Sequence, residues 1–268
     1  MAKRQTGWTE AKINRYLKAG RGKGELYNYK PWLTIQDVPS TGRVHRAVGW
    51  KTSRQHHLLS DLEFSYFCLC DWADDVIDIR EQFPLDREMT MRMADEKGIK
   101  HPKDNKSSTP IVMTTDFFLV VNNNEKVNYK ARTLKHSEDL NDKRTMEKFE
   151  IEREYWEKQG IDWAIVTEHE IPTNLIDNLK FIRHSFDTDI KDFNVFLTEW
   201  DKFAGELLPN LKYLDAKYNF EIGTSITLYK YALAKKILMV DMSKRITLHE
   251  DVQNIKLQKP SAMNKRWA

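Results

Sequence analysis

The strongest local pattern in the chain is a pair of stretches rich in β-branched and aromatic residues. The first covers residues 113–121 and the second covers residues 126–135, and three asparagines at 122–124 lie between them. β-Branched and aromatic residues favour strands, whereas asparagine favours turns. The pattern therefore predicts an antiparallel hairpin, in which side chains that face each other across the strands lie about 5 Å apart.

Further periodic segments surround this hairpin. Helical patterns are predicted at 8–19, 88–97 and 142–158, and a helix also follows Ser60; strands are predicted at 44–50, 76–83 and 163–167. The strand at 163–167 is almost wholly apolar, which is typical of a strand covered on both faces. The order strand, helix, strand predicts an α/β domain with a mixed sheet flanked by helices.

The pattern changes after residue 168 to short helical segments with little strand character. Helices are predicted at 174–183, 193–207, 211–218 and 224–234, followed by a hairpin-like pair of short strands at 236–242 and 246–249. We expect two domains, 1–170 and 171–268. Several small helices followed by a strand pair suggest a winged-helix-like second domain.

Composition narrows the class of protein. A chain of 268 residues with 40% hydrophobic content can bury a substantial core. No apolar run approaches the ~18 residues that a membrane span needs, so we expect a cytoplasmic protein. Cys68 and Cys70 are two residues apart on a predicted helix, a spacing that suits neither a disulfide nor a zinc site. We interpret them as core thiols in a reducing compartment.

Positive charge is concentrated near the start of the chain. Residues 1–60 contain twelve Lys or Arg against three acidic residues, although the whole chain carries only +3. Such an excess suits a phosphate-binding surface, and we take Arg43, Arg46, Lys51 and Arg54 as candidate DNA contacts. A solvated charged arm is the alternative. The glycine-rich basic loop at 20–24, which we expect to be flexible, lacks the Gly-Lys-Ser/Thr ending of a nucleotide-binding loop, which excludes that function.

The predicted hairpin carries a candidate catalytic pair. Asp116 lies near the start of its first strand and Lys135 at the end of its second. A carboxylate can bind a hard divalent cation, and a nearby ammonium can orient water or neutralise charge on a phosphate. This chemistry is used by nucleases. The alternative is a solvated ion pair worth roughly 0 to 1 kcal/mol.

Two further acids strengthen the nuclease hypothesis. Glu63 lies at a helix start, where Ser60 and Glu63 also fit a capping box, so capping alone could explain it. Glu152 shares a helix face with Phe149 and Trp156, which should pack inward. A carboxylate on such a face needs a function or a partner, and the alternative is a Glu at the edge of the face paired with Lys or Arg.

Five segments of the sequence resemble the TnsA family, the endonuclease subunits of heteromeric cut-and-paste DNA transposases. They are YKPWLT at 29–34, HHLLSDLE at 56–63, DIREQFPL at 78–85, TDF at 115–117, and RTMEK at 144–148 continuing to YW at 155–156. These segments lie within residues 1–180. Beyond about residue 185 the resemblance is limited to length and helical character.

The resemblance implies a restriction-endonuclease-like first domain and a helical, winged-helix-like second domain. It implies cleavage of the 5′ ends of a transposon, on the non-transferred strands, while an integrase-like TnsB partner processes the 3′ ends. It also implies that the second domain contacts an ATPase partner, TnsC. The protein would then act on double-stranded DNA and associate with the nucleoid when assembled.

Site residues also follow from the resemblance. Glu63 and Asp116 match metal-binding carboxylates, Lys135 matches an active-site lysine and Glu152 a further active-site acid; Mg²⁺ is the expected metal, with Mn²⁺ as a substitute. The residue two before the lysine, usually acidic in restriction-type nucleases, is Thr133 here. Glu63, Glu152 or the main-chain oxygen of Leu134 would then complete the metal shell.

Two other functions remain open from the sequence. A free-standing restriction-type or junction-resolving nuclease would cut DNA without partners. A DNA-binding adaptor would retain a vestigial nuclease core and bind through residues 1–60 and the second domain. Cleavage by the purified protein, alone and with a partner transposase, distinguishes the three.

Overall fold

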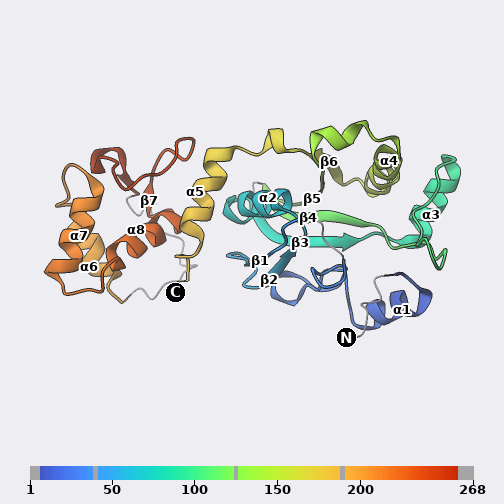
Figure 1. Cartoon of the computed structure of the whole chain (residues 1–268), viewed down its shortest axis with the longest axis horizontal. Coiled ribbons are helices and arrows are strands. Elements are labelled where there is room, and N and C mark those ends of the chain that lie inside the picture. Colours follow the sequence, from blue (N-terminus) through green and yellow to red (C-terminus); the bar gives the residue numbers. More distant parts are fainter. Residues whose placement is uncertain (1–6, 39–41, 124–125, 188–190, 259–268) are drawn as a thin grey trace. The chain divides into compact units, whose positions relative to one another are not determined.

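The computed structural model describes residues 7–38, 42–123, 126–187 and 191–258. The chain divides into two compact units, residues 1–171 and 172–268. The sequence pattern placed this division between residues 170 and 171. Figure 1 shows the elements of each unit.

A four-stranded mixed sheet forms the centre of the first unit, with strand order β3-β4-β5-β6. The strands are β3 (Val76–Pro84), β4 (Thr114–Asn123), β5 (Lys126–Leu134) and β6 (Asp162–Val166). β4 pairs antiparallel with both β3 and β5, and β6 adds parallel to β5. The predicted hairpin and the mixed sheet are confirmed; of the expected turn, Asn124 lies outside the described residues.

Helices cover both faces of this sheet, as the alternation of side chains along β4 requires. The helices of the first unit are α1 (Glu10–Lys18), α2 (Asp61–Trp72), α3 (Arg87–Glu96) and α4 (Lys143–Glu157). Phe117 and Leu119 of β4 belong to the same apolar cluster as Leu62 and Phe67 of α2. The intervening Phe118 packs on the other face, in a cluster with residues of α3 and α4. The α/β class with flanking helices is confirmed.

The basic glycine-rich loop at 20–24 is held by hydrogen bonds and packing rather than flexible. The N–H of Gly22 donates to the Lys30 carbonyl at 2.6 Å, and the Lys30 N–H donates back to the Lys23 carbonyl at 3.0 Å. Gly22 has a φ of +79°, a conformation that glycine adopts without steric cost. A side chain on Gly22 would also collide with Pro84. The expectation of a flexible loop was therefore wrong, because long-range packing orders it.

A separate ribbon of two strands, β1 (His45–Val48) and β2 (Gln55–Leu58), precedes α2. The pattern at 44–50 predicted β1 at slightly greater length. Both cysteines of α2, Cys68 and Cys70, are buried free thiols, which confirms their interpretation as core residues. None of the helices in the described ranges has the length and apolar content needed to span a bilayer.

The second unit contains four helices in its described part and one short ribbon. They are α5 (Thr173–Arg183), α6 (Phe193–Trp200), α7 (Leu207–Lys217), α8 (Thr224–Ala234), β7 (Leu238–Met239) and β8 (Lys256–Leu257). The helix predicted at 193–207 ends early, and Gly205, at φ +70°, lies before α7.

The strand prediction at 246–249 was wrong, because β7 pairs with β8 instead. The N–H of Ile246 donates to the side-chain oxygen of Asn178 at 2.8 Å. The hydrogen bond of this backbone N–H is therefore made to a residue of α5 rather than to a neighbouring strand. The winged-helix-like character of the unit stays a prediction.

Candidate active site

Asp116 occupies a point where the regular pairing of β4 is interrupted. Cα partners between β3 and β4 pass from Glu81–Phe117 directly to Phe83–Thr115, and the ladder with β5 ends at Phe117. The N–H of Leu134 donates to the Asp116 carboxylate at 2.7 Å. A backbone donor of β5 thus fixes the acid directly beyond the end of the β4–β5 ladder.

Gln82 holds the other oxygen of Asp116 and was missed by the sequence analysis. Its side-chain Nε2 donates to Asp116 Oδ1 at 3.0 Å, while its Oε1 accepts from the Thr114 hydroxyl at 3.0 Å. Gln82 is buried and has a φ of +48°, which is unusual for a residue other than glycine. A strained, buried amide in contact with an acid indicates a functional constraint. Only the strand pattern was visible in the sequence, and it does not distinguish Gln82 from its neighbours.

Glu63 is anchored at the start of α2 by both of its carboxylate oxygens. They accept from the Leu59 N–H at 3.0 Å and the Ser60 hydroxyl at 3.3 Å, and Ser60 in turn accepts from the Glu63 N–H. The capping role expected of Ser60 is confirmed. Glu63 binds the N–H of Leu59 rather than that of Ser60, so the reciprocal half of the capping box is altered. The anchored carboxylate is nevertheless close enough to Asp116 for their charges to interact.

Glu152 faces inward from α4, as its position between two aromatic residues predicted, and is 3% exposed. Its Oε1 accepts from the hydroxyls of Thr115 and Thr133. Each hydroxyl accepts in turn from an indole N–H, Thr115 from Trp156 at 2.7 Å and Thr133 from Trp163 at 3.2 Å. Hydroxyl groups, rather than a Lys or Arg, are therefore the hydrogen-bond partners that fix this acid.

Thr133, which replaces the acid usual in restriction-type nucleases, has a structural explanation. Its hydroxyl donates to Glu152, so a carboxylate from α4 lies one hydrogen bond away from the position where β5 lacks one. Helix α4 thus supplies an acid next to the strand. Sequence spacing did not reveal this, because residues 133 and 152 belong to different elements.

The electrostatics of these three acids are unusual. Burial raises the pKa of Glu63 to about 8, and the negative charge of Asp116 adds to this shift. Burial likewise raises the pKa of Asp116 to about 6 and that of Glu152 to about 7. Carboxylates whose pKa values are raised and whose charges interact mark a candidate functional site, because a bound cation would relieve their repulsion.

Lys135 lies directly after β5 and is half-exposed. Its ammonium forms an ion pair with Asp139 at 2.9 Å, not the solvated pair with Asp116 that was the alternative. Its positive charge still acts on Asp116 and lowers the pKa of that carboxyl against the effect of burial. The charges of Asp116 and Lys135 therefore interact, while the ammonium itself contacts Asp139, and the catalytic pairing of the two stays a prediction.

The donor set fits a hard divalent cation. Within the described ranges no group of three or more His, Cys, Asp or Glu side chains is placed to hold a metal ion. Mg²⁺ usually binds one or two carboxylates and completes its octahedral shell with water and substrate oxygens. Glu63 and Asp116 satisfy that requirement, and main-chain oxygen at Leu134 is chemically suitable as a third donor.

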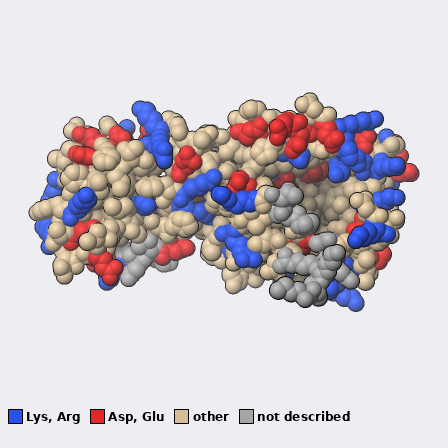
Figure 2. Space-filling model, in the orientation of Figure 1, with Lys and Arg blue, Asp and Glu red and all other residues tan. Residues whose placement is uncertain are grey.

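The four candidate DNA contacts differ in their exposure to solvent. Arg54 is only 7% exposed; its guanidinium binds both carboxylate oxygens of Glu81 at 2.7 Å and the Ile79 carbonyl at 2.9 Å. Its assignment as a phosphate contact was wrong, because this buried network occupies it. Arg43 and Arg46 are exposed and Lys51 is half-buried. Figure 2 shows basic and acidic side chains interspersed over the visible face.

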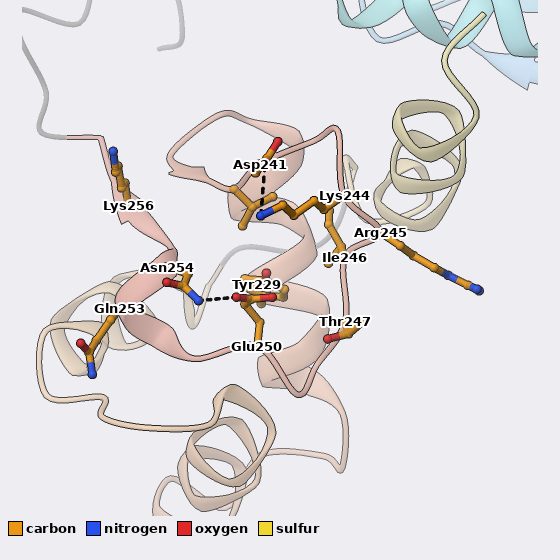
Figure 3. Close-up of a pocket in the computed structure, with 11 residues that line it drawn as sticks. Tyr229, Asp241, Lys244, Arg245, Ile246, Thr247, Glu250, Gln253, Asn254 and Lys256 are labelled. Carbon is orange, nitrogen blue, oxygen red and sulfur yellow. Dashed lines mark hydrogen bonds and ion pairs between the residues drawn. The ribbon is translucent and has the colours of Figure 1, made fainter.

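A polar pocket of about 360 Å³ lies within the second unit (Figure 3). At its base Tyr229 is fully buried, and its hydroxyl has no hydrogen-bond partner within the described part of the chain. Glu250, which contacts Asn254, lies beside it, and Lys244 and Arg245 also line the pocket. None of Glu63, Asp116 and Glu152 lines this pocket.

A mixed sheet flanked by helices, with one acid fixed beyond the end of a strand ladder, a second acid on an adjoining helix and a lysine at a strand end, is the arrangement expected of a restriction-endonuclease-like nuclease. Comparison with known proteins agrees. Residues 73–168 match the family model of the TnsA-like endonuclease N-terminal domain, and residues 170–242 match that of the TnsA endonuclease C-terminal domain.

A curated relative extends this match over most of the chain. The transposon Tn7 transposition protein TnsA of Escherichia coli is 37% identical over 234 residues, which cover 85% of this chain and 84% of the relative. The chain therefore belongs to the TnsA family, the endonuclease subunits of DNA transposases.

Proposed function

We propose that this protein is a Mg²⁺-dependent endonuclease that cuts the 5′ ends of a transposon, on the non-transferred strands, during excision. The observation that supports this most is the fixed position of Asp116, held by Gln82 and the Leu134 N–H beside Glu63. Two carboxylates oriented by separate donors form a preorganised cation site. Mn²⁺ is the expected substitute.

The reaction is phosphodiester hydrolysis that leaves a 5′-phosphate and a 3′-hydroxyl. When bound, Mg²⁺ would supply positive charge that offsets the carboxylates and polarises the phosphate. Lys135 orients the attacking water or stabilises the charge that develops on the phosphate, since its ammonium carries three donors on a flexible stem. Its ion pair with Asp139 is partly exposed, so it can exchange for substrate without a large energetic cost.

Glu152 has a supporting role in this proposal. Its carboxylate is fixed by Thr115 and Thr133, and its charge interacts with that of Asp116, so in its ionised form it adds negative charge that favours a bound cation. The raised pKa of Glu152, about 7, also allows it to hold a proton near neutral pH when no cation is present.

The proposed partners are double-stranded DNA at the transposon ends, a TnsB-like integrase-type subunit and a TnsC-like ATPase. The pocket of the second unit has a buried tyrosine hydroxyl without a hydrogen-bond partner in the described part of the chain, together with charged side chains. Buried polar groups without partners are rare and favour a ligand that satisfies them. We assign the ATPase contact to this unit.

The decisive experiment measures cleavage of labelled transposon-end DNA by the purified chain, with and without the partner transposase, in Mg²⁺ or EDTA. The proposal expects 5′-end cuts only with partner and Mg²⁺. Cutting by the chain alone would instead identify a free-standing nuclease, and absence of cutting under every condition would identify an adaptor with a vestigial core.

A second experiment tests the assignment of the ATPase contact. Full-length Arg245→Glu, at the pocket, should lose capture of the ATPase partner in a pull-down. Lys212→Glu, an exposed residue of α7 that does not line the pocket, is the matched control. Equal capture by both variants would remove the pocket from the interface. Deleting residues from 172 onward should abolish capture and leave Mg²⁺ binding intact.

A further inference from the structure

A second groove, of about 640 Å³, lies in the first unit between the N-terminal segment and β2. None of its eleven lining residues is Asp or Glu, and three of them are Lys or Arg. We infer that this groove binds the sugar-phosphate backbone of duplex DNA next to the scissile phosphate. The inference rests on the proposed endonuclease function and locates the DNA on the protein.

The charges of the groove are not all available to a ligand. Arg21 is paired with Asp37 at 2.5 Å and Arg54 with Glu81 at 2.7 Å, so both are internally neutralised. Lys30 is exposed, and its ammonium donates to the Ala19 carbonyl at 3.2 Å. Within the described ranges it has no acidic partner. Lys30 is therefore the cation that the groove offers to a phosphate.

The neighbouring ribbon adds a second cation to the same face. Arg46 of β1 is the Cα partner of His57 of β2, so the two side chains point to one side of the ribbon. Arg46 is exposed, and no acidic partner for it occurs within the described ranges. Its charge acts on His57, which lines the groove. Lys30 and Arg46 thus flank a half-buried imidazole.

Neutral donors complete the site. His57 Nδ1 is buried and has no hydrogen-bond partner within the described part of the chain. Gln55 and Asn28 are exposed amides that line the groove, and Tyr27 adds an exposed ring and hydroxyl. Contacts from Lys or Arg together with Asn, Gln and Tyr are the usual means of fixing a DNA backbone without reading its sequence.

The groove has a hydrogen-bonded floor and lies close to the Glu63 anchor along the chain. Arg54, the residue before β2, donates to the Leu26 and Ile79 carbonyls, which holds the floor of the groove in place. β2 ends at Leu58, and the next residue, Leu59, donates its N–H to Glu63. His57 therefore lies about 7 Å from this anchor along the chain, and that distance corresponds to roughly two nucleotides of helical rise. A backbone held in the groove would be close to the acid pair.

The test measures binding of the full chain to two unrelated fluorescein-labelled DNA duplexes by anisotropy, from low to moderate salt, in EDTA. Lys30→Ala and Arg46→Ala should each weaken binding of both duplexes about eightfold at 0.1 M salt and reduce the salt slope by about 0.9. The control is Lys23→Ala, which removes the same charge from an exposed residue of the adjoining loop that does not line the groove. It should leave the slope unchanged.

Three results would overturn the inference: equal losses in all three variants, a loss confined to one duplex sequence, or no binding of either duplex by the wild-type chain at low salt. Because EDTA prevents metal-dependent cleavage, the outcome is independent of the proposed reaction. Groove variants that bind normally while the wild-type assembly cuts DNA would refute the groove and leave the nuclease intact. Weakened DNA binding by the groove variants, with no cleavage by the wild-type assembly, would support the groove and refute the proposed nuclease function.

Discussion

Replacing Glu63 with Gln should stabilise the metal-free protein at alkaline pH. The carboxyl of Glu63 has a pKa of about 8, raised from an ordinary value of 4.5 by burial and by Asp116. Between these two pH values the folded state binds more protons than the unfolded state, so the free energy of unfolding falls as pH rises. Gln is isosteric and uncharged, and its oxygen can still accept the Leu59 N–H.

The size of the expected stabilisation follows from the shift in the pKa of Glu63. One pKa unit corresponds to about 1.4 kcal/mol, so the whole shift sets an upper limit of about 5 kcal/mol. Asp116 is half-buried, so water weakens its repulsion of Glu63, and part of that repulsion is already counted in the raised pKa of Asp116. We therefore expect Glu63→Gln to increase the free energy of unfolding by about 2–4 kcal/mol at pH 8.5. For a protein of this size that gain corresponds to a rise in Tm of roughly 5–10 °C. At pH 4 Glu63 is largely protonated in both the folded and the unfolded state. The difference in stability between the wild type and Glu63→Gln should therefore vanish.

The assay is thermal unfolding followed by circular dichroism in EDTA, at pH 4 and 8.5, repeated with Mg²⁺. Glu88→Gln, at an exposed position of α3, is the matched control and should show no such pH-dependent gain. Mg²⁺ should raise the Tm of the wild type, because binding to the folded state stabilises it, and should raise that of Glu63→Gln less. A variant destabilised equally at both pH values would falsify the reasoning and leave Glu63 as a helix cap alone.

Four other outcomes are expected. Asp116→Ala should abolish 5′-end cleavage by the assembly without loss of the folded circular dichroism spectrum; cleavage by the folded variant would remove Asp116 from the mechanism. Lys135→Ala should lower turnover about 10²–10³-fold and retain Mg²⁺ affinity by calorimetry, since an ammonium is not a ligand; a collapse of affinity would contradict its role. Gln82→Ala should weaken Mg²⁺ binding about 10–100-fold, because Asp116 loses a fixing donor, and unchanged affinity would make Gln82 purely structural. The wild-type chain alone should not nick plasmid DNA in Mg²⁺, and robust nicking would favour a free-standing nuclease.

Local patterns in the sequence determined most of the architecture. The β-branched and aromatic residues and the turn residues at 113–135 predicted the hairpin, and the helical spacing of Glu152 with Phe149 and Trp156 predicted that it faces inward. Such patterns are informative because strand and helix periodicity depend on neighbouring residues. For the same reason the sequence could place Asp116 and Lys135 near each other, because an antiparallel hairpin brings the outer ends of its two strands together.

Tertiary structure alone decided which polar groups meet. Arg54 resembled an ordinary surface cation in the sequence, yet Glu81, twenty-seven residues away, draws it into the core. Gln82 reaches Asp116 only because β3 and β4 are neighbours in the sheet. In the segment expected as a strand at 246–249, the Ile246 N–H donates to the Asn178 side-chain oxygen instead of to a strand. Burial of a polar group depends on a partner chosen by the fold, and a periodic pattern carries no information about that partner.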